Sequence, residues 1–253
     1  MGNEFSILKR DIKNMGVHAG DHLLVHASLK SIGRFENSAR IVIDAFLEVL
    51  GPEGTLLMPT LSYLTVNKEN PHFDQNETPS CVGALTEFFR TRRGVQRSVH
   101  PTHSVAGLGK EVDFFLADHL NDHTPCGPHS PFSKLKEKAG KVLFMGCGPK
   151  PNTSMHAIEE KVEPHYLLGA PVTYQLKLKD GQLIIKDYIR HGFKGFEQRY
   201  DRLIPLLKKE DYRKGHLLAA DALLLKTSPM WEKALLKLQE DPMYFVDRVG
   251  HHP

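Results

Sequence analysis

Apolar and polar residues follow two periods along the chain, and these periods predict short buried strands separated by helices. Residues 23–27 are an apolar run within AGDHLLVHASLKSIG, which ends in a polar turn closed by glycine. Residues 39–50, ARIVIDAFLEVL, place apolar side chains at helical spacing between a cap at Asn37 or Ser38 and a stop at GPEG. A second apolar run, TLLMPTLSY, follows. Strand, helix and strand in this order indicate a parallel crossover unit and therefore an α/β fold.

The later segments extend this pattern. KVLFMGCG predicts a buried strand, NTSMHAIEEKV a loop that opens a helix, and APVTYQLKLKDGQLIIKDYIRH a hairpin that turns at Asp180-Gly181. We further expect a helix over 196–209, a strand over 216–225 and a helix opened by Ser228-Pro229. The predicted fold class is α/β, with a mixed, largely parallel central sheet flanked by helices. Residues 1–253 form a single domain, either as one body or as two closely packed lobes.

Composition excludes several classes of protein. The chain has 253 residues, of which 40% are hydrophobic and 25% charged, enough to bury a core and to exclude a disordered chain. The net charge of +3 is dispersed, so we expect no nucleic-acid partner. No window approaches the roughly 20 apolar residues of a membrane span. Three cysteines make no disulfide framework and the first residues lack signal-peptide features, which together predict the cytoplasm.

The first candidate for chemistry is the turn after the first strand. Its hydroxyls, free amides and single lysine, Lys30, lie at the carboxyl end of a predicted strand, where α/β sheets bind ligands and where a phosphate could be held. The alternative is an ordinary solvated turn. GxGxxG and GxxxxGK[ST] are both absent, which disfavours nicotinamide and P-loop enzymes.

A second candidate is a histidine with two carboxylates on one predicted helix. Glu159 and Glu160 follow His156 by three and four residues, so either can reach its ring and orient it as a general base. A surface pair without catalytic function is the alternative. The polar residues Asn152, Thr153 and Ser154 precede the helix, where a hydroxyl or a free amide suits an oxyanion.

Fifteen histidines raise the question of a metal. His100, His103, His119, His123 and His129 share an irregular region with Cys126, but neither CxxC nor HExxH occurs. A zinc-dependent hydrolase is therefore a competing hypothesis from another class. Cys126 is either a nucleophile beside a histidine or a small buried thiol. A serine hydrolase of the α/β type would need GxSxG, which is also absent.

Several longer motifs, taken in order, resemble one family. VHASLKSIG, GPEGTLLMPT, FDQNETPSCVGALTEFFR, RSVHPTHSVAGLGK, TPCGPHSPFSKL and KVLFMGCGPKPNTSMHAIEE are similar to segments of the aminoglycoside 3-N-acetyltransferase family, also called antibiotic acetyltransferases, over about residues 20–165. The resemblance implies a fold distinct from that of the GNAT acetyltransferases, acetyl-CoA as donor and no metal. It implies as acceptor an aminoglycoside amine, the 3-amino group of the 2-deoxystreptamine ring.

The resemblance also implies residue roles. The run from Asn152 to His156 is similar to the Asn-Thr-Thr-Leu-His run of the family, which makes His156 the base, Glu159 the residue that orients it, and Thr153 a contact of the oxyanion. Transfer would be direct, without an acyl-cysteine. Residues implied to bind the coenzyme are His26, Ser28, Leu29, Lys30, Ser31, Gly33, His100, Thr102, Ser104 and Val105.

The acceptor is less determined. Aminoglycosides are polycations, so their site should be acidic, and Asp74, Glu77, Asp122 and Glu160 are the residues we expect to bind the substrate. A late segment resembles the family loosely, with Ala222 where an arginine often stands. Another amino sugar or small amine is therefore an alternative acceptor, and a relative that binds coenzyme A without turnover is a third class. We expect a small-molecule amine as partner, and we leave a homodimer open.

Overall fold

A computed structural model describes residues 3–33 and 35–250 of the chain. Within this part, seven strands form the main sheet in the order β10-β11-β6-β1-β2-β5-β4. β11 and β5 run antiparallel to their neighbours, and the other five strands share one direction. The sheet is therefore mixed and largely parallel, as the sequence predicts. Its strands are β1 (His22–Ala27), β2 (Thr55–Pro59), β4 (Gln96–Arg97), β5 (Val105–Gly109), β6 (Lys141–Met145), β10 (Tyr212–Leu217) and β11 (Ala220–Lys226).

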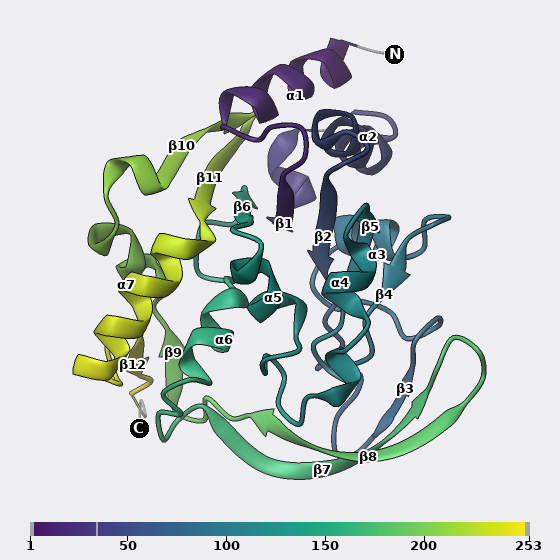
Figure 1. Cartoon of the computed structure of the whole chain (residues 1–253), viewed down its shortest axis with the longest axis vertical. Coiled ribbons are helices and arrows are strands. Elements are labelled where there is room, and N and C mark those ends of the chain that lie inside the picture. Colours follow the sequence, from purple (N-terminus) through teal and green to yellow (C-terminus); the bar gives the residue numbers. More distant parts are fainter. Residues whose placement is uncertain (1–2, 34, 251–253) are drawn as a thin grey trace.

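Alternating side chains of the central strands divide the core into two layers. On one face, Leu23 and Val25 of β1 and Leu143 of β6 pack against α1 (Asn3–Asn14), α2 (Ser38–Leu50) and α3 (Ala84–Arg90). On the other face, Leu24 and Phe144 pack with the remaining helices. Figure 1 shows these helices across the front of the sheet: α4 (Val112–Leu116), α5 (Pro131–Glu137), α6 (Ser154–Glu159) and α7 (Thr227–Glu240).

The crossover unit predicted from the first 60 residues is confirmed, because β1 and β2 pair in parallel and α2 lies between them in the chain. The predicted hairpin is confirmed as β7 (Leu168–Lys177) and β8 (Leu183–His191), and β7 also pairs with β3 (His72–Asp74) to form a separate sheet. Figure 1 shows this hairpin as a long curved arm beyond the end of β2. A two-stranded sheet pairs β9 (Phe196–Gln198) with β12 (Val246–Arg248).

Two predicted elements near the carboxyl end are wrong. The expected helix over 196–209 is β9 followed by the 3-10 turns η3 (Tyr200–Leu206) and η4 (Lys209–Asp211), and Pro205 inside η3 removes a backbone donor that an α-helix needs. The expected single strand over 216–225 is the hairpin of β10 and β11, which turns where Leu218 has a φ of 52°. Two further 3-10 turns occur, η1 (Leu29–Ile32) and η2 (His119–Asn121).

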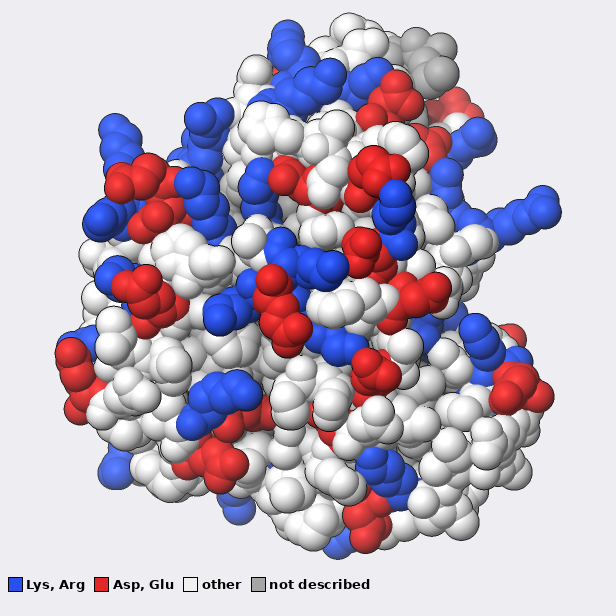
Figure 2. All heavy atoms as spheres, in the orientation of Figure 1, with Lys and Arg blue, Asp and Glu red and all other residues white. Residues whose placement is uncertain are grey.

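The face of the molecule drawn in Figure 2 has the dispersed charge that the sequence predicts. Figure 2 shows acidic and basic side chains interspersed over the drawn face, without a broad area of one sign. Among the described residues, no helix combines the length and the apolarity that crossing a membrane requires.

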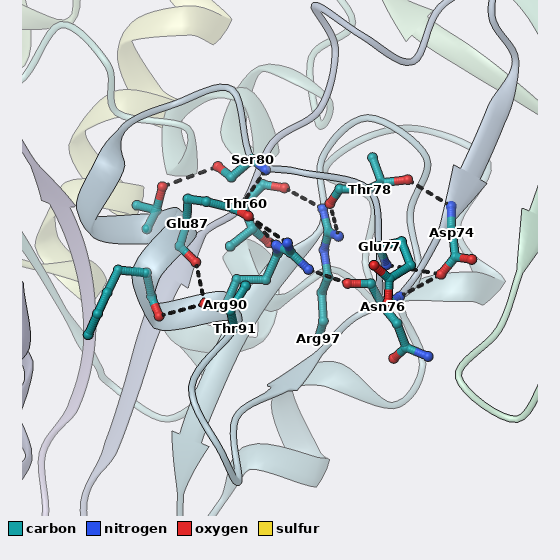
Figure 3. A network of polar contacts seen from close by, with 12 residues as sticks. Thr60, Asp74, Asn76, Glu77, Thr78, Ser80, Glu87, Arg90, Thr91 and Arg97 are labelled. Carbon is teal, nitrogen blue, oxygen red and sulfur yellow. Dashed lines mark hydrogen bonds and ion pairs between the residues drawn. The ribbon is translucent and has the colours of Figure 1, made fainter.

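A buried arginine ties together segments that border the carboxyl edge of the sheet (Figure 3). The Arg97 guanidinium donates to Thr60 O at 2.9 Å, Thr78 O at 2.6 Å and Ser104 Oγ at 2.9 Å. Its carbon also lies 4.9 Å from the centre of the Phe73 ring. Burial lowers the pKa of Arg97 to about 9, so the group is still cationic at neutral pH. Carbonyl dipoles in place of a carboxylate satisfy this buried charge.

Arg97→Met should lower the free energy of unfolding by about 3 kcal/mol, because the carbonyls of Thr60 and Thr78 lose a charged donor inside the protein. Urea unfolding followed by circular dichroism measures the change. The matched control is Arg93→Met, which removes the same charge from an exposed position and should change stability by less than about 0.5 kcal/mol. Equal stability of the two variants would contradict the role given to Arg97.

Candidate active site

A cavity of about 530 Å³ opens where the parallel strands β1, β2 and β6 end, the edge at which α/β sheets bind ligands. Four parts of the chain contribute its walls: His26 and Ala27 of β1, Thr102 and His103, residues between 147 and 156, and the end of β8 with the segment after it. Tyr200 from η3 closes one side. The two sheets and the loops that connect them thus meet at one site.

The site is organised around the carboxylate of Glu159, which has no exposed surface. Tyr166 Oη donates to Glu159 Oε1 at 2.8 Å, and Tyr200 Oη donates to Oε2 at 2.7 Å. Burial, followed by the charge of Glu159, raises the pKa of both phenols, so both stay protonated and serve as donors. The carboxylate thereby joins α6, the segment before β7 and η3.

His156 is the third group on this carboxylate. Its Nδ1 lies 3.0 Å from Glu159 Oε2 and 2.8 Å from Tyr200 Oη. Because the Tyr200 proton points to Glu159, we assign the Nδ1 proton of His156 to the same carboxylate. Nε2 is then an unprotonated nitrogen on a ring that lines the cavity. This arrangement can accept a proton from a bound ligand.

The turn predicted to hold phosphates follows β1, and Ser28 N donates to Met145 O at the end of β6. Ser31 Oγ donates to Ser28 O at 2.6 Å. A Cβ at Gly146 would lie 1.7 Å from Ser31 Oγ, so only glycine lets this turn approach the end of β6. Leu29, Lys30 and Gly33 complete the turn, with Lys30 exposed. The turn follows Ala27, which lines the cavity, but none of residues 28–33 lines it.

Two of the other expected coenzyme residues, His26 and Thr102, line the cavity. His26 stacks on Phe144 with ring centres 5.1 Å apart. His100, Ser104 and Val105 are buried behind the wall instead. His100 Nδ1 accepts from the backbone amides of Thr102 and His103, and Ser104 Oγ lies in the Arg97 network. These three residues lie behind the part of the cavity wall that Thr102 and His103 form.

Thr153 lines the cavity at the start of α6, next to the expected base. Cys126 is buried under it, with its Sγ 3.8 Å from Thr153 O. Burial, followed by the charge of Glu160, raises the pKa of the Cys126 thiol well above its usual value. A buried, protonated thiol is a poor nucleophile, which favours the buried-thiol interpretation of this residue.

The four carboxylates expected to bind the substrate do not converge on the cavity. Asp74 pairs with Lys177 at 3.0 Å on the separate sheet, and Glu77 is exposed nearby. Asp122 is buried and accepts from His129 N at 3.0 Å. Glu160 lies behind the wall, hydrogen-bonded to Thr124, Cys126 and His191. None of the four lines the cavity.

One cluster has the chemistry of a metal site. Ligand atoms of Cys126, Glu160 and His191 lie within 4.8 Å of one another. Glu160 Oε1, however, already accepts from Cys126 N at 2.8 Å and from His191 Nε2 at 2.7 Å. The high pKa of the buried thiol also opposes the thiolate that zinc requires. The donors thus fit a closed hydrogen-bond set around Glu160 better than a zinc site.

Sequence reasoning missed four residues of the site. Tyr166 and Tyr200 lie in segments without a motif, and only the fold brings them to Glu159. Arg190 and His191 end β8 and line the cavity although the hairpin looks like an ordinary surface arm in the sequence. A histidine and an arginine at the end of an otherwise alternating strand are the one local signal, and it is weak.

Comparisons with known proteins agree with the geometry. A family model described as aminoglycoside 3-N-acetyltransferase matches residues 24–239. Aminoglycoside N(3)-acetyltransferase IV of Salmonella sp is 32% identical over 239 residues, which cover 92% of this chain and 86% of the relative. Among solved structures, a histidine-to-alanine variant of aminoglycoside acetyltransferase AAC(3)-IVa in complex with a gentamicin has a TM-score of 0.79 at 30% identity, covering 95% of this chain and 90% of that chain.

A further solved structure, AAC-IIIb binary with CoASH, shares the fold with a TM-score of 0.80 at 24% identity, covering 93% of this chain and 96% of that chain. The matched region extends past residue 165, where the resemblance read from the motifs ended, and includes the hairpin of β7 and β8.

The free energy of unfolding should decrease as the pH falls below about 6.5, because five histidines are buried as neutral rings and gain a proton when the chain unfolds. Burial lowers the pKa of all five, to about 3 for His26 and His119. Since the unfolded chain then binds more protons than the folded one, each contributes about 1.4 kcal/mol per pH unit between its two pKa values. The remaining three are His100, His103 and His191.

Asp122 and Glu160, whose pKa values burial raises to about 6, act in the opposite direction but are only two groups. Urea unfolding at pH 7.5, 6.5 and 5.5 measures the sum. A loss of several kcal/mol by pH 5.5 is expected, and a stability that stays constant or rises over this range would show that the histidines are not held neutral.

Proposed function

The chain belongs to the aminoglycoside 3-N-acetyltransferase family, and from that premise we propose that it carries the acetyl group of acetyl-CoA to an amine with His156 as the general base. Family membership makes the protein an acyltransferase with acetyl-CoA as co-substrate. One observation carries the assignment of the base. The His156 ring lines the cavity while Glu159 and Tyr200 hold its Nδ1.

In the proposed reaction the amine nitrogen attacks the thioester carbonyl of acetyl-CoA. A carbon–nitrogen bond forms and the carbon–sulfur bond breaks, so the products are the acetamide and free coenzyme A. The proton lost by the amine passes to His156 Nε2, and the imidazolium can return it to the departing sulfur. Glu159 stabilises the imidazolium, since its carboxylate already receives the Nδ1 proton.

Thr153 is the residue we propose to face the oxyanion of the tetrahedral intermediate. It lines the cavity at the start of α6, one turn before His156. A hydroxyl or a backbone amide at this place is close to the base and is fixed by the helix, which is what a preorganised donor requires.

The coenzyme should bind along the turn of residues 28–33 and the wall containing His26 and Thr102. The turn lies at the carboxyl end of β1 and abuts Gly146, so it is held close to the cavity. His100, Ser104 and Val105 support this wall from behind. Free cysteines, together with the need for acetyl-CoA, favour the cytoplasm as the place of action.

The first acceptor to test is the one that the names of the relatives give, the 3-amino group of an aminoglycoside. The whole of residues 1–253 would act as one domain, since the cavity takes residues from β1 through η3. A homodimer remains a prediction that the cavity does not require, because one chain supplies its walls.

The competing class, a zinc-dependent hydrolase, is disfavoured, because the chain belongs to an acyltransferase family and the cluster of Cys126, Glu160 and His191 fits a closed hydrogen-bond set better than a zinc site. Metal analysis of the purified protein separates the two. Stoichiometric zinc that is needed for turnover would favour the hydrolase, whereas thiol release from acetyl-CoA in a chelator would favour the transferase.

His156→Ala should lower turnover by about two to four orders of magnitude, because a protonated amine cannot attack the thioester and no other group takes its proton. The affinity for coenzyme A should stay nearly unchanged. Thiol release from acetyl-CoA with the best acceptor is the measurement of turnover, and calorimetry with coenzyme A is the measurement of its affinity.

Glu159→Gln is the matched variant, and it should lose less than His156→Ala because it weakens orientation and charge but keeps the base. Retention of full activity by His156→Ala with the best acceptor would refute the assignment of the base, even though the family assignment would stand.

Lys30→Ala should weaken the increase in melting temperature that coenzyme A produces, since a ligand that binds only the folded state stabilises it by an amount that grows with the logarithm of its affinity. Thermal unfolding with and without coenzyme A measures the effect. Lys136→Ala, at an exposed position of α5, removes an equal charge away from the turn. Equal shifts in wild type and Lys30→Ala would remove Lys30 from the phosphate site.

A further inference from the structure

The cavity carries a charge opposite to the one that an aminoglycoside needs. Among the residues that the structure describes, those lining the cavity include no aspartate and no glutamate. Two of them are basic, Lys150 and Arg190, and four are histidines, His26, His103, His156 and His191. Burial holds the pKa of three of these histidines well below neutrality, so they are uncharged: His26, His103 and His191.

Two carboxylates next to the cavity wall are hidden behind the histidines that they orient. Glu159 has no exposed surface and already accepts from Tyr166, Tyr200 and His156. The side chain of Glu160 is 6% exposed and accepts from Thr124, Cys126 and His191. A ligand in the cavity therefore meets imidazole rings rather than carboxylate oxygens.

The two cations differ in their partners. Lys150 forms an ion pair with Glu197. Arg190, near the end of β8 and half-buried, makes neither an ion pair nor a side-chain hydrogen bond with any residue that the structure describes. An arginine that lines a cavity and has no partner there retains five donors for a ligand. Their planar arrangement matches a carboxylate or a phosphate.

A second unpaired group lies next in the chain. The His191 side chain is 7% exposed, its Nε2 donates to Glu160, and its Nδ1 has no partner. A buried acceptor of this kind is expected to be satisfied by a ligand or a water. The His191 ring centre is 4.7 Å from that of His156, so this acceptor lies beside the expected base.

These observations decide between two kinds of acceptor. A polycation would give up the hydration of several ammonium groups on entering a cavity that offers them no carboxylate, and it would approach an unpaired arginine. An amine with an anionic group meets a donor for that group and a base for its nitrogen. Tyr63 at the mouth, 46% exposed, and Phe193 add aromatic surface for the body of such a molecule.

We propose that the preferred acceptor of this enzyme is a small amine that also carries a carboxylate or a phosphate, with Arg190 holding the anion while His156 takes the proton of the amine. The proposal rests on the function proposed above and narrows its acceptor. Arg190 determines specificity in this arrangement, and His191 Nδ1 accepts from a hydroxyl or ammonium group of the same molecule.

The test compares matched acceptors with the intact chain. Glucosamine, glucosamine 6-phosphate and muramic acid share an amino sugar and differ in having no anion, a phosphate or a carboxylate, while gentamicin represents the polycations. Thiol release should give a kcat/KM at least about tenfold higher for one of the two anionic sugars than for glucosamine or gentamicin. A higher value for gentamicin would overturn the proposal.

Arg190→Gln should raise KM for the favoured anionic sugar by about tenfold or more and leave KM for acetyl-CoA unchanged. Lys194→Gln is the matched control, because it removes the same charge from an exposed residue of the neighbouring segment. Arg190→Glu should in addition improve kcat/KM for gentamicin relative to the wild type. An increase in KM for acetyl-CoA instead would assign Arg190 to the coenzyme phosphates and overturn the proposal.

Calorimetry of acceptor binding in the presence of coenzyme A separates this proposal from the function on which it rests. An anionic sugar that binds through Arg190 while none of the four acceptors is acetylated would refute the transferase function and keep the charge assignment. Acetylation of gentamicin with unaltered kinetics in Arg190→Gln would keep the transferase function and refute the charge assignment.

Discussion

The buried carboxylate of Glu159 is the constraint on which the rest of the site depends. A charge without exposed surface is stable only when donors surround it, and here these donors come from three separate segments: Tyr166, Tyr200 and His156. Satisfying the carboxylate therefore brings η3 and the segment before β7 to α6, where Tyr200 closes one side of the cavity. The same bond sets the tautomer of His156 and directs its free nitrogen into the cavity. The hydrogen bonds of Glu159 thus determine both the position of these segments and the orientation of the His156 ring.

Burial also explains how several of the described histidines pack inside the protein. His100 stacks on His119 with ring centres 5.0 Å apart, and each ring uses its Nδ1 in a hydrogen bond, from the amides of Thr102 and His103 or with Ser98. These rings act as neutral polar packing beneath the wall of the cavity. A dense set of neutral imidazoles keeps the interior polar without fixed charge, and it leaves the charged groups at the surface of the cavity to select the ligand.

Local sequence predicted what local interactions determine. The crossover of β1, α2 and β2, the hairpin of β7 and β8, and the pairing of His156 with Glu159 depend on spacing within one or two elements. The helix expected over 196–209 failed because Pro205 and the contacts of Tyr200 outweigh helical spacing there. The expected acidic site failed to assemble for a different reason. Whether Asp74 or Arg190 reaches the cavity depends on how the separate sheet lies against the main one, and no pattern within a segment encodes that.

Two consecutive carboxylates, Glu159 at the end of α6 and Glu160 directly after it, connect the proposed base with the proposed selection of the acceptor. Glu159 holds His156, and the next residue, Glu160, holds His191 at 2.7 Å, so one short helix orients two neighbouring rings. Each imidazole covers its carboxylate, which removes the negative surface that would attract a polycation. Arg190, which lies next to His191 and has no partner among the described residues, then gives the cavity a positive charge. In the proposed arrangement, the two carboxylates that orient His156 and His191 are thereby withdrawn from the cavity, so the same hydrogen bonds that prepare the proposed base also leave Arg190 and Lys150 as the charged groups that a ligand meets.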